Sequence, residues 1–104
     1  HDNVTTEGWR ATASPEDVHY ACRYLRCTPK DLTEAMIAAC LSCVSDMAII
    51  PMADWLHLGA EARINTPSTQ GSNWQWRLTT PLTSLLADHI ADLTVLYDRA
   101  PAAE

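Results

Sequence analysis

Residues 47–52, Met47-Ala48-Ile49-Ile50-Pro51-Met52, carry the pattern that decides the fold class of this chain. The stretch is short, continuously apolar and bounded by Asp46 and Asp54. Such a run is typical of a β-strand that is buried on both faces, as in a parallel sheet. A lone buried strand would leave costly unpaired backbone N–H and C=O groups. We therefore expect it to pair with strands that lie outside these 104 residues.

Two helices are predicted before this stretch. Residues 14–17, Ser-Pro-Glu-Asp, form a strong helix start, with serine at the N-cap, proline next and acids in the first turn. This helix should run to about Arg26. A second helix should begin near Asp31 or Thr33 and reach about Ser45, because its apolar residues follow helical spacing. A helix followed by a buried strand is half of a βα repeat.

A long loop and a third helix are predicted after the strand. Residues 53–58 should form a helical turn that ends at Gly59. Residues 60–80 are rich in Asn, Thr, Ser, Pro and Gly, and a loop of this length in a compact domain is often functional. Thr80-Pro81 should open the last helix. Its apolar stripe is Leu82, Leu85, Leu86, His89, Ile90, Leu93, Leu96 and Tyr97.

The chain begins with His1-Asp2-Asn3, in a segment predicted to be loop from residue 1 to residue 13. A neighbouring imidazole and carboxylate can ligate a metal, act as an acid–base pair or hold a polar ligand. Taken alone, the dipeptide is a weak signal, and ordinary surface residues explain it more often.

The predicted loop contains a second group of functional side chains. Residues 61–67 and 73–78 bring together hydrogen-bond donors and aromatic rings. If residues 73–78 are extended, Trp74 and Trp76 share one side of the backbone. Indole faces stack on sugar rings, while Asn and Arg bind hydroxyl groups. A hydrophobic lid over the end of a barrel explains the tryptophans equally well.

Four segments together resemble one known family. Residues 1–9, 49–54, 61–67 and 73–78 are similar, in order and spacing, to the C-terminal part of glycoside hydrolase family 77. These are the 4-α-glucanotransferases, also called amylomaltases or disproportionating enzymes. The resemblance covers most of the chain, and the Asn-Thr-Pro turn with the Asn-Trp-Gln-Trp-Arg run is its most diagnostic part.

The resemblance implies an α/β fold, namely the C-terminal portion of a (β/α)8 barrel. Within this chain the fold would be mostly helical, with one buried parallel strand near residues 47–52. Residues 1–104 would be the C-terminal part of a single catalytic barrel domain. They would supply the loop after strand 7, helix 7, strand 8, the long active-site loop and helix 8.

The resemblance also implies a retaining transfer of 4-α-glucosyl segments between maltodextrin chains. Two carboxylates roughly 5 Å apart act as nucleophile and acid/base in such enzymes. Asp2 matches a third carboxylate, which stabilises the oxocarbenium-like transition state, and His1 matches its substrate-binding neighbour. Asn65 matches a loop residue close to the sugar, and Arg63 and Trp74 are expected to bind substrate. The nucleophile and the acid/base have no counterpart here, so the chain alone is expected to be inactive.

Four positions depart from the family pattern. Val4 replaces a usual Asp, Ala53 a usual Gln and Ser68 a usual Gly, while His57 stands where Gly is common. These departures bear on acceptor preference and level of activity more than on the family.

The composition excludes several kinds of partner. The chain is 47% hydrophobic and 19% charged, with a formal net charge of −6. It has no clustered Lys and Arg for nucleic acid or an anionic membrane, and no apolar run near the roughly 18–20 residues of a membrane span. The family resemblance, rather than the composition, implies the expected partners: an α-1,4-glucan such as maltodextrin and the N-terminal part of the same barrel. A cytoplasmic location is expected, or a plastid if the parent protein comes from a plant or alga.

The four cysteines have a C-x4-C and C-x2-C spacing, at Cys22, Cys27, Cys40 and Cys43. That spacing is compatible with zinc or a disulfide. Cys40 and Cys43 lie in an Ala-rich helical segment, where thiols usually act as small buried apolar groups. No metal and no cofactor are therefore expected.

Two other functions remain open at this point. The Trp-containing loop could belong to a non-catalytic carbohydrate-binding or interaction module. A hydrolase on the same scaffold is the third possibility, and the ratio of transfer products to free glucose would separate it from a transferase.

Overall fold

The chain forms a succession of helical segments in the computed structural model, which describes residues 3–66, 69–71, 73–79 and 81–101. No strand occurs among these residues. The elements, in order, are α1 (Thr6–Thr12), α2 (Pro15–Leu25), the 3-10 turn η1 (Pro29–Asp31), α3 (Leu32–Ser42), α4 (Met52–Trp55), the 3-10 turn η2 (Ala60–Ala62) and α5 (Ser84–Leu96).

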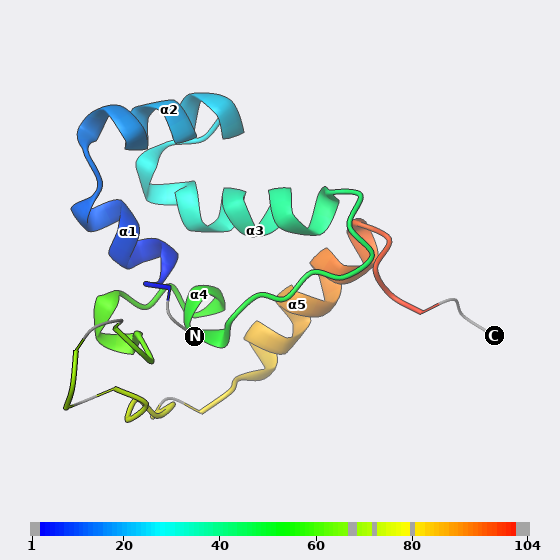
Figure 1. Cartoon of the computed structure of the whole chain (residues 1–104). Helices are drawn as coiled ribbons and strands as arrows, with labels where there is room; N and C mark the ends of the chain where they lie inside the picture. The colour runs from blue at the N-terminus through cyan, green and yellow to red at the C-terminus, as the bar shows by residue number, and fades with distance from the viewer. Residues whose placement is uncertain (1–2, 67–68, 72, 80, 102–104) are drawn as a thin grey trace.

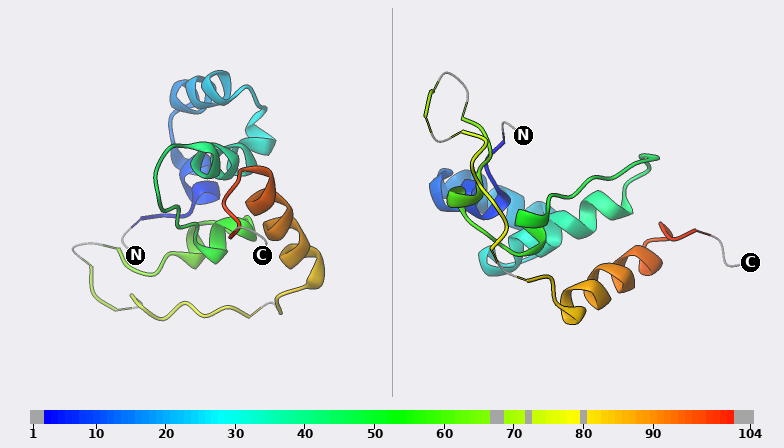
Figure 2. Two further views of the ribbon diagram at one scale, coloured as in Figure 1. Left: turned by 90° about the vertical axis from the view of Figure 1, so that its right-hand side faces the viewer. Right: turned by 90° about the horizontal axis from the view of Figure 1, so that it is seen from below.

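The helices build an open arrangement around α3 (Figure 1). α2 is stacked on one side of α3, and α5 crosses its other side. Figure 2 shows that the segment between α4 and α5 runs away from the helices as a wide loop. The radius of gyration is 15.2 Å, whereas a compact domain of this length has about 13 Å. Much of the helical surface therefore lacks a covering layer.

Short polar side chains set the helix starts. The Ser14 hydroxyl accepts a hydrogen bond from the Asp17 amide at 3.2 Å, and α2 ends at Leu25, with Arg26 as its C-cap residue at a φ of 56°. This confirms the helix predicted from Ser14 to about Arg26. The helix predicted to begin near Asp31 or Thr33 is also confirmed as α3, although it ends at Ser42.

The prediction that residues 1–13 are all loop is wrong, because residues 6–12 form α1. Thr5 caps α1, since its hydroxyl accepts a hydrogen bond from the Gly8 amide at 3.1 Å. Gly8 weakens helix propensity but allows close packing. A Cβ added to Gly8 would lie 2.6 Å from Val4 Cγ2 and 3.0 Å from the Ala60 amide nitrogen. Contact with η2 therefore favours glycine at this position.

The last helix begins later than predicted. α5 starts at Ser84, where the Thr83 hydroxyl accepts a hydrogen bond from the Leu86 amide at 3.2 Å. Pro81 therefore lies before the helix, in the segment that leads into it.

The strand predicted at residues 47–52 is not confirmed: residues 47–51 have no regular secondary structure, and Met52 begins α4. A strand needs a neighbouring strand to pair with its backbone groups, and the described residues provide none. The predicted burial of this segment on both faces is not seen within the described chain. Ala48 and Ile50 pack against the apolar core, whereas Met47 and Ile49 are 74% and 79% exposed. One side of the segment is thus covered by helices and the other is open.

The core lies where α3, α4 and α5 meet. Ile37 and Leu41 from α3 are buried with Trp55 from α4. Partly buried apolar side chains pack around these three residues: Ala48, Ile50, Met52, Leu86, Ile90, Leu93 and Tyr97. This core fixes α4 and the segment before it, which together carry one wall of the site described below.

The outer surfaces of the helices remain rich in apolar side chains. No described residue of α5 is fully buried, and Leu85, Val95 and Leu96 are 66% exposed or more. A search of the described residues finds no helix with the length and hydropathy needed to span a bilayer.

Candidate functional site

His1 and Asp2, the predicted substrate-binding and catalytic pair, lie outside the described residues. The described chain begins at the next residue, Asn3, and enters α1 through Val4 and Thr5. The site can therefore be built from the residues that surround this end of the chain.

Three segments far apart in sequence meet around a cavity of about 560 Å³, which we call the first cavity. They are residues 3–6 at the chain start, residues 49–54, and Ala62, Ile64 and Trp76 of the long loop. The lining residues are Asn3, Val4, Thr5, Thr6, Ile49, Pro51, Met52, Ala53, Asp54, Ala62, Ile64 and Trp76.

A hydrogen bond fixes two of these segments to each other. The Thr6 amide donates to Asp54 Oδ1 at 2.8 Å, across 48 positions of sequence. Thr6 is the first residue of α1, so its amide has no partner within the helix, and a carboxylate is favourable there. Asp54 thereby sets how the chain start lies against α4.

A second cavity of about 580 Å³ lies on the side of the long loop. Arg63 lines it, as do the polar residues Glu61, Thr66, Asn73 and Gln75. Val4 and Trp76 line both cavities, so the two cavities adjoin at these side chains. Together the cavities combine an apolar wall with amide, guanidinium and carboxylate groups, which suits a polyhydroxylated ligand.

Asn73 organises the loop around the second cavity. Its Oδ1 accepts a hydrogen bond from the Thr66 amide at 2.8 Å. Its Nδ2 donates to the Thr69 carbonyl at 3.1 Å and to the Thr69 hydroxyl at 3.0 Å. The Trp74 amide adds a backbone hydrogen bond to the Ile64 carbonyl at 2.5 Å. One side chain therefore ties together the two ends of the predicted sugar-binding segment.

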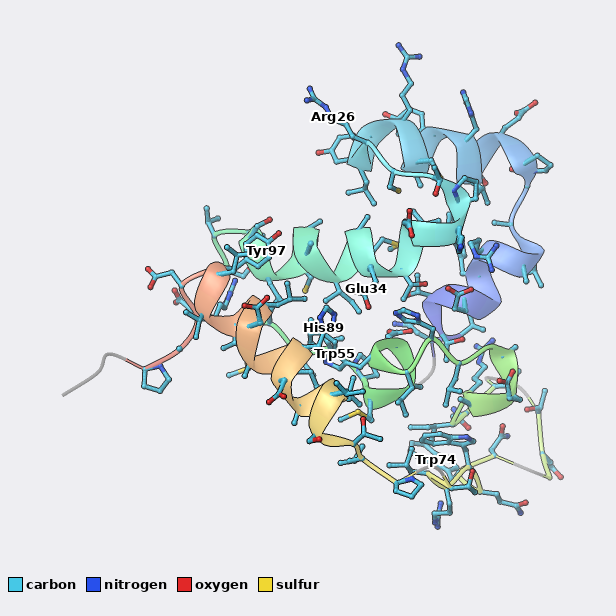
Figure 3. The ribbon with its side chains drawn as sticks, turned by 180° about the vertical axis from the view of Figure 1, so that it is seen from behind. Arg26, Glu34, Trp55, Trp74, His89 and Tyr97 are labelled. Carbon is cyan, nitrogen blue, oxygen red and sulfur yellow. The ribbon has the colours of Figure 1, made fainter. Side chains whose placement is uncertain are left out.

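The predicted loop residues occupy different places. Arg63 lines the second cavity, and its Nε donates to the Asn65 carbonyl at 2.9 Å. Asn65 and Trp74 are absent from the described residues that line the two cavities. Trp74 is 54% exposed and has a φ of 65°, so the run from 73 to 78 is interrupted by a turn (Figure 3). Trp74 and Trp76 consequently differ in environment, since only Trp76 lines the cavities.

Asp54 was not singled out as a site residue by the sequence, and Asn73 and Trp76 were noted there only as members of the run 73–78, without a committed role. Each stands in a segment that carries the family resemblance, which was the available signal. Their roles depend on contacts between distant segments, which the spacing of residues along the chain does not reveal.

The charge balance around α1 favours ionised Glu7. Its carboxylate accepts hydrogen bonds from Arg10 Nη2 at 2.7 Å and from the Thr33 hydroxyl at 2.9 Å. Burial raises the pKa of Glu7, but the hydrogen bonds from Arg10 and Thr33 outweigh it, so the pKa is lowered overall. Glu7 thus joins α1 to α3 as a charged group.

A Glu–His cluster lies beside the core, where α3, the end of α4 and α5 approach one another (Figure 3). Glu34 Oε1 lies 2.6 Å from His57 Nε2, and Glu34 Oε2 lies 3.0 Å from His89 Nε2. The His89 ring also packs edge-on against Trp55, with centroids 5.9 Å apart. His57 has a φ of 57°, where glycine would be more comfortable, so its contact with Glu34 offsets a backbone cost.

The cysteines take no part in these cavities. All four are free thiols; Cys22 is buried, Cys43 is exposed, and the other two are intermediate. Within the described ranges, no group of three or more His, Cys, Asp or Glu side chains is arranged to hold a metal ion.

Comparison with known proteins identifies what the chain is similar to. A family model described as 4-alpha-glucanotransferase matches residues 1–83. The chloroplastic/amyloplastic 4-alpha-glucanotransferase of Arabidopsis thaliana is 40% identical over 104 residues, which cover 95% of this chain and 18% of that protein. The 4-alpha-glucanotransferase of Clostridium butyricum is 41% identical over 102 residues, which cover 95% of this chain and 21% of that protein.

A solved structure has the same arrangement. Amylomaltase from Streptococcus agalactiae, in complex with acarbose, superposes with a TM-score of 0.89 at 34% sequence identity. The match covers 97% of this chain and 21% of that one. The chain therefore spans about one fifth of the length of these relatives.

Proposed function

Because the chain belongs to the 4-α-glucanotransferase family, glycoside hydrolase family 77, we propose that it is part of an enzyme that transfers 4-α-glucosyl segments between maltodextrin chains. The observation that carries this proposal is the convergence of described residues from the chain start, from residues 49–54 and from the long loop around adjoining cavities. The lining residues fall in the segments 1–9, 49–54, 61–67 and 73–78, which carry the family resemblance, apart from Ala60, which lines the second cavity.

Within that enzyme, this chain would form the end of the barrel. The open side of residues 47–51 supports this proposal, since helices cover Ala48 and Ile50 while Met47 and Ile49 stay exposed. A barrel strand has helices on one face and barrel interior on the other. α3 would then be the seventh barrel helix and α5 the eighth, with residues 47–52 pairing into the sheet once the neighbouring strands are present.

The catalytic role proposed for this chain is transition-state stabilisation by Asp2. During transfer, one carboxylate forms a covalent glycosyl intermediate, while another first protonates the leaving oxygen and then activates the acceptor hydroxyl. Positive charge develops on the sugar ring in both steps. A third carboxylate that hydrogen-bonds ring hydroxyls contributes more in the transition state than in the ground state. The nucleophile and acid/base would come from earlier barrel strands.

The substrate-binding roles fall to residues around the cavities. His1 would bind the sugar beside Asp2, and Arg63 would donate from the wall of the second cavity, which it lines. Asn65 lies beside Arg63, whose side chain donates a hydrogen bond to the Asn65 carbonyl, and it would bind the sugar from there. Trp74, whose side chain is 54% exposed, would stack on an outer glucose unit.

The test uses the full-length protein that carries this chain, incubated with maltotriose. We expect longer and shorter maltodextrins in preference to free glucose, and no transfer by the chain alone. Asp2→Asn in the full-length protein should lower kcat by at least about a hundredfold with little change in KM, because the lost contact acts mainly in the transition state. Equal losses in kcat and in binding would contradict the role of Asp2.

A non-catalytic carbohydrate-binding module is the second candidate, and the exposed Trp74 indole favours it. The same assay separates the two functions. A binding module would retain maltodextrin affinity and show no transfer in the full-length protein, whether or not Asp2 is replaced. A hydrolase on the same scaffold would release mainly glucose and maltose.

A further inference from the structure

The C-x2-C motif at the end of α3 has no part in the site above. Cys40 lies in the last turn of α3, and Cys43 is its exposed C-cap residue. The Cys43 thiol donates a hydrogen bond to the Cys40 carbonyl at 3.0 Å, so its sulfur turns back toward the residue one turn earlier. The two cysteines are therefore neighbours on one edge of the molecule.

Arg99 places a positive charge beside this pair. It follows α5 and reaches back to the end of α3, where its Nε donates to the Leu41 carbonyl at 2.9 Å and its Nη2 to the Cys43 carbonyl at 3.0 Å. Nη2 also lies 3.9 Å from Cys43 Sγ. These backbone contacts hold the guanidinium in place, so the charge next to the sulfur is fixed rather than incidental.

We propose that Cys43 is a thiol modification site for small anionic disulfides such as glutathione disulfide, with Cys40 as the resolving thiol. The geometry supports each part. The Cys43 thiol is exposed, Arg99 can stabilise its thiolate and attract a carboxylate-bearing reagent, and Cys40 is three residues away. Cys43 leaves the helix as an extended C-cap residue, with a φ of −72° and a ψ of 168°, and its sulfur already lies 3.0 Å from the Cys40 carbonyl oxygen. A disulfide needs the two Cβ atoms about 3.5–4.5 Å apart, so disulfide formation requires the Cys40 and Cys43 side chains to turn toward each other.

The pKa values of Cys43 and Cys27 are shifted in opposite directions, which favours reaction at Cys43. Hydrogen bonding from Ser45 and the nearby Arg99 lower the pKa of Cys43. Burial, followed by the neighbouring Cys22, raises the pKa of Cys27. Because the thiolate is the reacting species, Cys43 should react faster than Cys27 near neutral pH. The C-x4-C pair thus provides a control within the same chain.

The reaction takes place in two exchange steps. The Cys43 thiolate attacks one sulfur of glutathione disulfide; the Cys43–glutathione S–S bond forms, the S–S bond of the reagent breaks, and one glutathione thiolate leaves. Cys40, after giving its proton to solvent, attacks the Cys43 sulfur; the Cys40–Cys43 bond forms and the second glutathione leaves. Two protein thiols are oxidised to a disulfide while one glutathione disulfide is reduced to two glutathione molecules.

Peptide mass spectrometry of the full-length protein tests this proposal after incubation with glutathione disulfide at neutral pH. We expect a transient glutathione adduct on Cys43 and then a Cys40–Cys43 disulfide. Cys40→Ser should accumulate the adduct, Cys43→Ser should prevent both products, and Cys27→Ser should change neither. An adduct that does not accumulate in Cys40→Ser would overturn the role of Cys40.

The rate of alkylation by iodoacetamide gives a second readout, which does not depend on disulfide formation. In the folded protein, Cys43 should react several times faster than Cys27, and the ratio should approach one in denaturant. Arg99→Gln should move the midpoint of the pH–rate profile of Cys43 to higher pH. Arg99→Lys keeps the positive charge, so its midpoint should stay close to that of the original protein. Equal rates for Cys43 and Cys27 in the folded protein would overturn the proposal.

Discussion

The core between α3, α4 and α5 and the loop at residues 63–77 are held by different forces. In the core, apolar side chains such as Ile37, Leu41 and Trp55 exclude water. In the loop, the side chain of Asn73 makes hydrogen bonds to the backbone and to the Thr69 hydroxyl, and most of the described loop residues are exposed. Burial of a large side chain stabilises a protein by several kcal/mol, whereas an exposed hydrogen bond contributes about 1 kcal/mol or less.

If the proposed function holds, the core residues mainly determine stability and the loop residues mainly determine sugar binding. The core positions α4, and through Asp54 it positions the start of the chain. The loop shapes the second cavity without contributing to the core. Substitutions in the core should therefore reduce the free energy of unfolding, while those in the loop should mainly change sugar binding.

The largest effect is expected from Trp55→Ala compared with Trp74→Ala, since the same substitution falls in the two regions. Trp55 is 8% exposed and Trp74 is 54% exposed. Trp55→Ala should cost about 3–5 kcal/mol of unfolding free energy, because it leaves a cavity in the core. Trp74→Ala should change it by about 0.5 kcal/mol or less and should weaken maltodextrin binding. Denaturant unfolding and calorimetry on the full-length protein measure both quantities. Similar losses of stability in the two variants would contradict the comparison.

An intermediate effect is expected from Glu7→Gln, which affects a charged contact between α1 and α3. The substitution should cost about 1–3 kcal/mol at neutral pH, since Glu7 accepts hydrogen bonds from Arg10 and Thr33.

The pH dependence of that effect has a definite sign. The pKa of Glu7 in the folded protein lies below its ordinary value of 4.5, so the unfolded state binds more protons between the two pKa values. The stability from Glu7 is thus present above about pH 4.5 and is lost as the pH falls through the folded-state pKa. The stability difference between the original protein and Glu7→Gln should narrow in acid. A difference that stays constant from pH 7 to acid would argue against an ionised Glu7 at this contact.

The smallest effect on stability is expected from Asn73→Ala. It removes the hydrogen bonds to Thr66 and Thr69, so the amide of Thr66 should exchange faster with deuterium. Unfolding free energy should fall by about 1 kcal/mol or less, while maltotriose affinity should weaken by roughly threefold to tenfold. Asn73→Asp is the matched control, because it keeps the acceptor for Thr66 and loses the donor to Thr69. Unchanged exchange and affinity in Asn73→Ala would show that the loop is ordered by other contacts.

The local signals in the sequence were reliable where a helix start depends on its own residues. Ser14-Pro15 marked α2 correctly because the serine hydroxyl and the Asp17 amide are three residues apart. α1 was missed because its glycine lowers helix propensity, while the benefit of that glycine comes from contact with η2. The strand predicted at residues 47–52 is not confirmed, because the described chain offers no neighbouring strand with which it could pair.

The residues of the candidate site likewise divide into those that the sequence predicted and those that only distant contacts reveal. Arg63 was predicted to bind substrate and lines a cavity. Trp76, which lines both cavities, was considered with Trp74, but only Trp74 was given a substrate-binding role. The substrate-binding role of His1 and the catalytic role of Asp2 rest on the family pattern alone, because both residues lie outside the described residues.

The sequence by itself determined the family, the Ser14 cap of α2 and the apolar segment before α4, because these depend on residue identity and short spacing. Only the tertiary structure decided which side of residues 47–51 is covered, that Asp54 holds the start of α1, and that Trp76 rather than Trp74 faces the cavities. The physical reason is that these features depend on contacts across tens of residues. The energy of such contacts is set by packing and hydrogen-bond geometry in three dimensions, and neither is encoded in local spacing.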